Sequence, residues 1–185
     1  RDATGQHHQV GCDLHLFAQQ GVGTAHHHLA VVLVDRPTVG GTFDPQQLDG
    51  VPRERIVEAL HGCGLWASIR QRPLGKIADP ARTPVAIYVN GLDTEPLAAD
   101  PAFAVKGRGE ALQLGIDLLR RLTDGPVRLT VRAGGAPADE FRNLRGVETH
   151  EFAGPHPAGL VGTHIAAIQP LRGTEVAWYL KAQEA

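Results

Sequence analysis

The spacing of hydrophobic positions changes along this chain, and the changes predict alternating strands and helices. Residues 83–90, TPVAIYVN, form a nearly charge-free run, which is typical of a strand covered on both faces. Residues 126–133, PVRLTVRA, alternate apolar and polar positions and predict a second strand. Two further segments, 147–152 and 175–182, also read as strands, and the apolar run 29–34, LAVVLV, reads as a buried one.

Helical spacing separates these predicted strands. Residues 52–64 begin with a proline, which fits the first turn of a helix, and end in two glycines. Residues 107–125 form the strongest predicted helix, with basic residues near its C-terminal end. Residues 138–144 predict a short helix. The apolar stripes are Ile56, Val57 and Leu60 in the first helix and Leu112, Ile116 and Leu119 in the second.

The order of these elements predicts an α/β fold, a mostly parallel sheet with flanking helices. We assign the α/β domain to residues 52–185. Residues 29–51 combine the apolar run with a turn-rich connector, and we interpret them as the remnant of a preceding domain.

Residues 1–28 show neither helical nor strand periodicity and are rich in histidine. Three interpretations remain: a metal-binding cluster, an irregular terminus, or a segment that is not native coding sequence. We disfavour metal binding because adjacent histidines in an extended chain point to opposite sides and no fixed acidic partner accompanies them. We therefore expect no metal site. The histidines are His7, His8, His15, His26, His27 and His28.

Composition narrows the class of protein. Hydrophobic residues make up 42% of the 185 residues, which is ordinary for a globular domain, and the net charge of −2 gives no basic field for nucleic acid. Cys12 and Cys63 are the two cysteines, too few for a disulfide framework. The chain begins with Arg1 and contains no methionine, so we expect a fragment of a longer protein.

Two unusual loops are predicted at one edge of the sheet. The segment FAGPHPAGLVGTHI, residues 152–165, places a loop from Gly154 to Thr163 directly after a strand, and residues 90–101 follow another strand. Ligands of open α/β sheets bind beyond the carboxyl ends of the strands. Two prolines stiffen the first loop around His156, which could present an imidazole to a ligand. Packing against a neighbouring domain is an equally good interpretation.

Several segments together resemble the NqrA family, which forms one subunit of the Na⁺-translocating NADH:quinone oxidoreductase. Besides FAGPHPAGLVGTHI, they are LDGVPRERIVEALHGCGLWASIRQRP, AIYVNGLDTEPLAADP, EALQLGIDLLRRLTDGPV and GTEVAW. The resemblance extends from Leu29 to the end of the chain. It implies a fold similar to the flavin- and NADH-binding subunit of respiratory complex I. It also implies a longer protein, with a barrel-like region before this part and further domains after it.

The resemblance also implies a function. Members of this family are peripheral subunits at the cytoplasmic face of the bacterial inner membrane, docked on membrane-embedded subunits. Their complex passes electrons from NADH through flavins and iron–sulfur centres to ubiquinone and exports Na⁺. The NqrA family is associated with quinone binding, so the resemblance implies ubiquinone as the substrate and no complete active site in this chain alone.

One segment departs from the flavin-binding relatives. Those proteins have a glycine-rich loop after the first helix, which lets backbone amides approach the flavin phosphate. Here the corresponding segment is GLWASIRQRP, whose bulky side chains would block that approach. We therefore expect no flavin and no iron–sulfur centre in this chain. The residues of this degenerate nucleotide loop are Leu65, Arg70 and Arg72, and the altered acidic loop that accompanies it carries Asp93 and Glu95.

A quinone headgroup requires an apolar slot and one or two donors aimed at its carbonyl oxygens. His156 and His164 could donate, and an imidazole can also transfer protons near neutral pH. Trp66 and Phe152 could supply aromatic surface. Each of these residues also has a purely structural interpretation. Trp66 could be a core residue, His164 could bond a backbone carbonyl, and the arginines of the degenerate loop could pair with the acidic loop. The full set of quinone or interface candidates is Phe152, Pro155, His156, Gly159, His164 and Trp66.

Three functions therefore remain as hypotheses. The first is a quinone-associated peripheral subunit of the sodium-pumping enzyme. The second is a non-catalytic docking module of a respiratory complex. The third is a flavin- or NADH-binding domain of the Rnf type, which the bulky GLWASIRQRP segment disfavours.

Overall fold

A six-stranded sheet organises the part of the chain that the computed structural model describes, residues 50–134 and 137–185. The strand order is β2-β1-β6-β3-β4-β5. Strands β6, β3, β4 and β5 are parallel, whereas β1 runs antiparallel to both β6 and β2. This arrangement confirms the predicted α/β sheet. The bounds are β1 (Arg70–Arg72), β2 (Lys76–Ile77), β3 (Ile87–Asn90), β4 (Val127–Arg132), β5 (Glu148–Phe152) and β6 (Ala177–Lys181).

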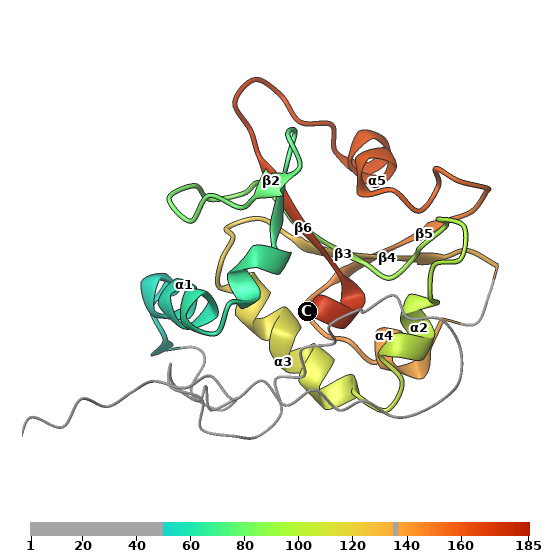
Figure 1. Ribbon diagram of the computed structural model, residues 1–185, viewed down its shortest axis with the longest axis horizontal. Helices are drawn as coiled ribbons and strands as arrows, with labels where there is room; N and C mark the ends of the chain where they lie inside the picture. Colours follow the sequence, from blue (N-terminus) through green and yellow to red (C-terminus); the bar gives the residue numbers. More distant parts are fainter. Residues whose placement is uncertain (1–49, 135–136) are drawn as a thin grey trace, which may run out of the picture.

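The helices divide unequally between the two faces of the sheet. Helices α1 to α4 lie on one face, and α5 lies by itself on the other (Figure 1). The three predicted helices are confirmed, although α3 ends about one turn earlier than its apolar pattern suggested. The helical bounds are α1 (Arg53–Gly62), η2 (Leu65–Ser68), α2 (Pro101–Ala104), α3 (Gly109–Arg120), α4 (Asp139–Arg142), α5 (Val161–Ile168) and η3 (Ala182–Glu184).

The larger hydrophobic core lies between the sheet and α1 and α3. Alternate side chains of the three central strands β3, β4 and β6 point into it, and the predicted stripes of both long helices meet them there. Each fully buried aliphatic or aromatic side chain of this kind contributes roughly 1.5–3 kcal/mol. The sheet contributes Ile87, Val89, Val127, Leu129, Val131, Trp178 and Leu180, and the helices contribute Ile56, Leu60, Leu112, Ile116 and Leu119.

The opposite face of the sheet is more polar. Val161 and Ile165 of α5 pack on Tyr88 and its small neighbours. The polar positions of β4 point to this face, but Arg128 is only 9% exposed. Its Nε donates to Glu148 Oε2 at 2.9 Å, and its Nη1 donates to the Tyr88 hydroxyl at 2.9 Å. Burial favours a lower pKa for Arg128, but these two partners raise the pKa overall, so the guanidinium remains charged.

Residues 65–77 form structure that the hydrophobic pattern did not predict. A 3₁₀ helix at Leu65–Ser68 leads into a short hairpin made of β1 and β2. The hairpin turn is closed by a hydrogen bond of 2.7 Å from the Gly75 N–H to the Gln71 carbonyl. Both strands are short and polar, so alternation gave no signal for them.

Some predicted features lie outside the described residues. These are the histidine-rich segment 1–28, the apolar run 29–34 and all but the last two residues of the connector that follows it. Within residues 50–134 and 137–185, no helix is long and apolar enough to span a bilayer.

We predict that Gly125→Ala destabilises the fold. A Cβ at position 125 would lie 1.9 Å from the backbone oxygen of Val85, at the entry to β3. Because the obstacle is backbone, relief requires the α3–β4 connection to move, and we expect a loss of roughly 3 kcal/mol in the free energy of unfolding. Chemical denaturation followed by circular dichroism measures this loss.

Gly109→Ala is the matched control, because a Cβ at position 109 would come no closer than 3.7 Å to a neighbour. If the two variants unfold at the same denaturant concentration, the close approach of the connection to β3 is wrong.

Candidate functional site

The four parallel strands end at the same edge of the sheet. Asn90, the last residue of β3, is level with Lys181 at the end of β6 and with Thr130 of β4. The last residues of β4 and β5, Arg132 and Phe152, are likewise paired. The loops that leave β3 and β5 therefore begin at the same edge of the sheet, as the sequence predicted, with β4 between the two strands (Figure 1). We call residues 91–100 and 153–160 the strand-end loops.

Direct hydrogen bonds join the two strand-end loops. The Gly159 N–H donates to Thr94 Oγ1 at 2.9 Å. Thr94 Oγ1 also lies 3.4 Å from Nδ1 of His156. Gly159 is buried, and a Cβ at this position would lie 2.6 Å from the Thr94 backbone nitrogen. The glycine is therefore required by the close approach of the two loops.

Asn90 holds this arrangement at the sheet edge, and the sequence pattern gave it no role. Its side-chain nitrogen donates to the Gly159 carbonyl at 2.8 Å. Its side-chain oxygen accepts from the Leu92 N–H at 3.1 Å and from Thr130 Oγ1 at 3.2 Å. One carboxamide thus connects β3, β4 and both loops. One feature of the sequence could have identified Asn90: it is an amide at the end of an apolar strand, where the ends of neighbouring strands lie close together.

His156 lies on the exposed part of the loop, between Pro155 and Pro157. Two backbone hydrogen bonds of 2.9 Å, from Ala158 N–H to the Pro155 carbonyl and from Leu160 N–H to the Pro157 carbonyl, fold this segment into consecutive turns. The imidazole is therefore presented to solvent from a rigid backbone. The loop is shorter than predicted, because residues from Val161 onward are helical.

His164 occupies a different environment from His156. It is completely buried, and its ring lies 4.3 Å from the half-buried ring of Phe152, measured between centroids. Its Nε2 lies 2.7 Å from the Ala158 carbonyl oxygen, so the hydrogen is on Nε2 and is donated to the loop. Burial lowers the pKa of His164 and keeps the imidazole neutral. The side chain fixes the loop to α5 and does not reach the surface.

The acidic loop is tied to the same edge of the sheet. Asp93 Oδ2 accepts from Lys181 Nζ at 3.1 Å, and Asp93 Oδ1 accepts from the Glu95 N–H at 2.9 Å. Burial opposes ionisation of Asp93, but these hydrogen bonds and the lysine charge lower its pKa overall. Glu95 is exposed.

The arginines of the degenerate loop do not pair with Asp93, and that alternative was wrong. The guanidinium of Arg72 lies over the ring of Tyr179, 5.5 Å from its centroid. Arg70 is exposed on β1.

Leu65 and Trp66 lie in the 3₁₀ helix η2, within the segment that the sequence analysis interpreted as a degenerate nucleotide loop. Trp66 is 2% exposed, and its Nε1 donates to the Ala78 carbonyl at 2.8 Å. Its ring contacts Trp178 edge-on at a centroid distance of 5.4 Å. Trp66 therefore belongs to the core on the α1 face and adds no aromatic surface at the strand-end loops. Residues 65–73 form a 3₁₀ helix and a strand, as bulky side chains at this position would require, and not an open glycine-lined cradle.

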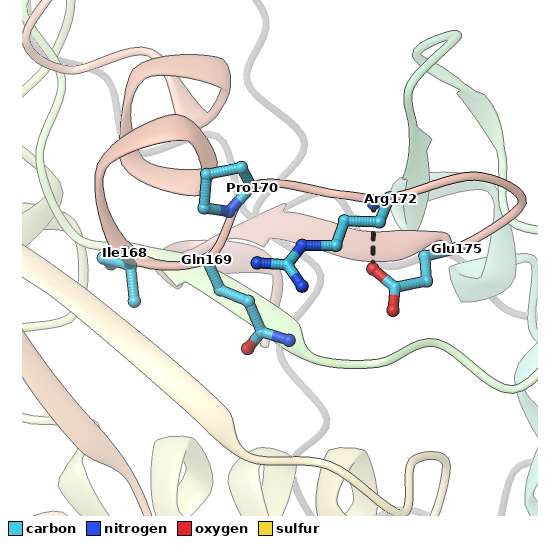
Figure 2. Close-up of a pocket in the computed structure, with 5 residues that line it drawn as sticks. All are labelled: Ile168, Gln169, Pro170, Arg172 and Glu175. Atoms are coloured by element: carbon cyan, nitrogen blue, oxygen red, sulfur yellow. Dashed lines mark hydrogen bonds between the residues drawn. The ribbon is translucent and has the colours of Figure 1, made fainter.

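A separate surface hollow lies at the other end of α5, in its connection to β6. Its volume is about 340 Å³, and Figure 2 shows Gln169 and Arg172 pointing into it. The Arg172 N–H donates to Glu175 Oε2 at 2.9 Å across the loop. No sequence pattern pointed to this hollow. The lining residues are Ile168, Gln169, Pro170, Arg172 and Glu175. Within the described ranges, no three His, Cys, Asp or Glu side chains are grouped to hold a metal ion.

Comparison with known proteins places most of this chain in one family. Residues 51–185 match the family described as the NqrA second alpha/beta domain. The chain is 40% identical over 143 residues to the Na(+)-translocating NADH-quinone reductase subunit (NqrA) of Pasteurella multocida. It is 39% identical over 142 residues to the same subunit of Neisseria meningitidis serogroup A, and 40% identical over 142 residues to that of Yersinia pseudotuberculosis. Each alignment covers 77% of this chain and 31% of the relative, so the chain spans about a third of their length.

We predict that Gly159→Ala separates the strand-end loops. The added methyl group would overlap the Thr94 backbone, so the hydrogen bonds from Gly159 N–H and from Asn90 would be lost or lengthened. We expect a loss of roughly 2 kcal/mol in stability and faster amide exchange at Gly91 to Glu95. Hydrogen–deuterium exchange measures the local effect.

Gly162→Ala serves as the control, since a Cβ there would come no closer than 3.6 Å to Arg72, within α5. It should leave exchange in residues 91–95 unchanged. Equal protection of these residues in both alanine variants would contradict the close contact of the loops.

We also predict a pH dependence of stability that originates in His164. Its folded-state pKa lies below the unfolded value of about 6.5, so the unfolded chain binds more protons in the intervening range. Stability should therefore be complete above about pH 6.5 and fall as the pH is lowered from there to the folded pKa, by at most ~1.4 kcal/mol per pH unit. The slope can be measured by urea unfolding between pH 8 and pH 5.

His164→Gln retains a donor for the Ala158 carbonyl but cannot be protonated. Its stability at pH 8 gives the structural cost of the substitution alone, and its slope below pH 6.5 should be shallower than that of the unsubstituted chain. An unchanged slope would show that His164 does not carry the effect.

Proposed function

The chain belongs to the NqrA family, and we propose that it serves as part of a peripheral subunit of a Na⁺-translocating NADH:quinone reductase. In this proposal, the subunit lies at the cytoplasmic face of the bacterial inner membrane, docks on membrane-embedded subunits and contributes to ubiquinone binding. The family match over residues 51–185 is the observation that carries it. Relatives that share about 40% of their aligned residues with this chain bear the name of that subunit.

The strand-end loops are the part of this chain that we propose faces the quinone. They lie beyond the carboxyl ends of the parallel strands, where ligands of such sheets bind. His156 is exposed there on a backbone restrained by two prolines, so ordering it against a ligand costs little entropy. Its imidazole can donate a hydrogen bond to a quinone carbonyl oxygen. Phe152 is half-buried behind it and adds aromatic surface.

Under this proposal the chain binds and positions, while redox centres elsewhere in the complex supply the electrons. The candidate set is smaller than the sequence suggested, because the candidate donor His164 and the candidate aromatic residue Trp66 are both buried. His156 is the candidate that keeps an exposed side chain able to donate.

A docking module without quinone contact is the second candidate function. One observation favours it: hydrogen bonds among Asn90, Thr94 and Gly159 join the strand-end loops to each other and to the sheet. Polar groups that are already paired within the protein are not free to bind a ligand, whereas a rigid interface does not require free donors.

Photoaffinity labelling of the assembled complex separates these functions. With a photoreactive ubiquinone analogue, the first function predicts crosslinks within residues 153–160 that excess ubiquinone suppresses. His156→Ala should lower the yield there about fivefold, because it removes a hydrogen-bond donor and a hydrogen bond contributes ~1 kcal/mol. His61→Ala, which removes a histidine from an exposed position of α1, is the control and should leave the yield unchanged. Crosslinks confined to other subunits would reject quinone contact and leave the docking module.

A further inference from the structure

The hydroxyl of Thr94 lies at the junction of the two strand-end loops, beside the imidazole of His156. Its oxygen accepts from the Gly159 N–H at 2.9 Å and lies 3.4 Å from His156 Nδ1. Thr94 is itself fixed, because it stands inside the turn that the Glu95 N–H closes onto Asp93 Oδ1 at 2.9 Å. The hydroxyl is therefore held at a defined place relative to the ring.

The hydrogen bonds of this hydroxyl determine what it offers to the ring. A threonine hydroxyl has one hydrogen to donate and two lone pairs with which to accept. An amide N–H can only donate, so the bond from Gly159 occupies a lone pair and leaves the hydroxyl hydrogen free. Within residues 50–134 and 137–185, His156 Nδ1 is the one further partner at hydrogen-bonding distance from Thr94 Oγ1. Within this part of the chain, the hydroxyl hydrogen is satisfied only if it is donated to Nδ1.

Charged groups flank the hydroxyl, and their contacts lie elsewhere. Asp93 Oδ2 accepts from Lys181 Nζ at 3.1 Å, and Arg132 Nη2 donates to the Asp93 carbonyl at 3.3 Å. Glu95 contributes its backbone N–H to the turn, while its side chain is exposed. The contact between the hydroxyl and the imidazole therefore belongs to none of these charge contacts, and its direction depends on the hydroxyl hydrogen.

We propose that Thr94 is a positioning residue that holds His156 in the tautomer with its hydrogen on Nε2. A neutral imidazole has one N–H and one bare nitrogen, so a hydrogen bond donated to Nδ1 places the ring hydrogen on Nε2. The side chain of His156 is exposed, so the ring presents a donor to a ligand at the strand-end loops. At 3.4 Å the bond from Thr94 is long, but it strengthens when Nε2–H is engaged, because linked hydrogen bonds polarise one another.

This tautomer gives the proposed site a preference for the oxidised form of its ligand. A quinone carbonyl oxygen accepts hydrogen bonds and has no hydrogen to donate, so it is complementary to Nε2–H. The reduced form, a quinol, carries a hydroxyl there, whose hydrogen finds no acceptor on this ring and is left unpaired. The inference rests on the proposed function for the identity of the ligand, whereas the tautomer is a property of this chain alone.

Nitrogen-15 NMR of the full-length protein, labelled at histidine, tests the tautomer. The shifts of Nδ1 and Nε2 show which nitrogen carries the hydrogen, and His156→Gln identifies the signals. At about pH 9, well above the ordinary titration range of histidine, we expect the hydrogen on Nε2. Thr94→Asp keeps an acceptor for the Gly159 N–H but has no hydrogen to donate, so it should move the ring hydrogen to Nδ1.

Two further variants separate this role from a merely structural one. Thr94→Ser retains the hydroxyl and should retain the hydrogen on Nε2. Thr149→Asp makes the acidic change at an exposed position of β5 and should leave the His156 signals unchanged. A ring hydrogen on Nδ1 in the unsubstituted protein, or an unchanged tautomer in Thr94→Asp, would overturn the proposal.

Competition in the photoaffinity experiment tests the preference for the oxidised form. In the assembled complex, without NADH and without oxygen, ubiquinone should suppress the crosslinks within residues 153–160 at an about fivefold lower concentration than ubiquinol of the same tail length. This factor is the one expected for a single hydrogen bond. The preference should disappear in Thr94→Asp and remain in Thr149→Asp. Equal suppression by both forms in the unsubstituted complex would overturn the preference.

Failure of this inference is distinguishable from failure of the proposed function. If ubiquinone suppresses no crosslink within residues 153–160, the proposed function fails, and the preference for the oxidised form fails with it. If the crosslinks are suppressed but His156 carries its hydrogen on Nδ1, the proposed function stands and only the role of Thr94 is rejected.

Discussion

The edge of the sheet that carries the strand-end loops depends on the hydrogen bonds of one side chain, the carboxamide of Asn90. It ends β3, accepts from β4 and from its own loop, and donates to the loop that follows β5. Even a partly buried amide loses stability when its hydrogen bonds are not made, so these bonds hold the segments in place against one another. The geometry of both strand-end loops follows from this one group, together with the missing side chain of Gly159.

The two faces of the sheet have different physical roles. The face under α1 and α3 is apolar and carries most of the hydrophobic burial. The face under α5 contains Arg128, Tyr88 and Thr130, whose polar groups depend on specific partners. Stability can therefore reside in one face, while the other positions a short helix and, through the buried His164, the loop that carries His156.

The surface at the strand ends combines rigid backbone with exposed side chains. His156 and Leu97 both project from segments whose backbone is restrained, the one by prolines and the other by a left-handed turn. Neither contributes to the core. The proposed quinone contact draws on this arrangement.

The sequence by itself determined the α/β class, the two long helices and the convergence of the two loops, because periodicity and strand polarity are local properties that the chain order converts into a sheet. It also suggested that bulky residues at 65–73 stand where flavin-binding relatives have a glycine-rich loop, which stays a prediction. Only the tertiary structure decided which of two similar histidines is exposed, that Asp93 pairs with Lys181 and not with an arginine, and that Asn90 joins the loops. Those outcomes depend on contacts between residues 60 to 90 positions apart, and no local pattern encodes which distant partner a polar side chain will meet.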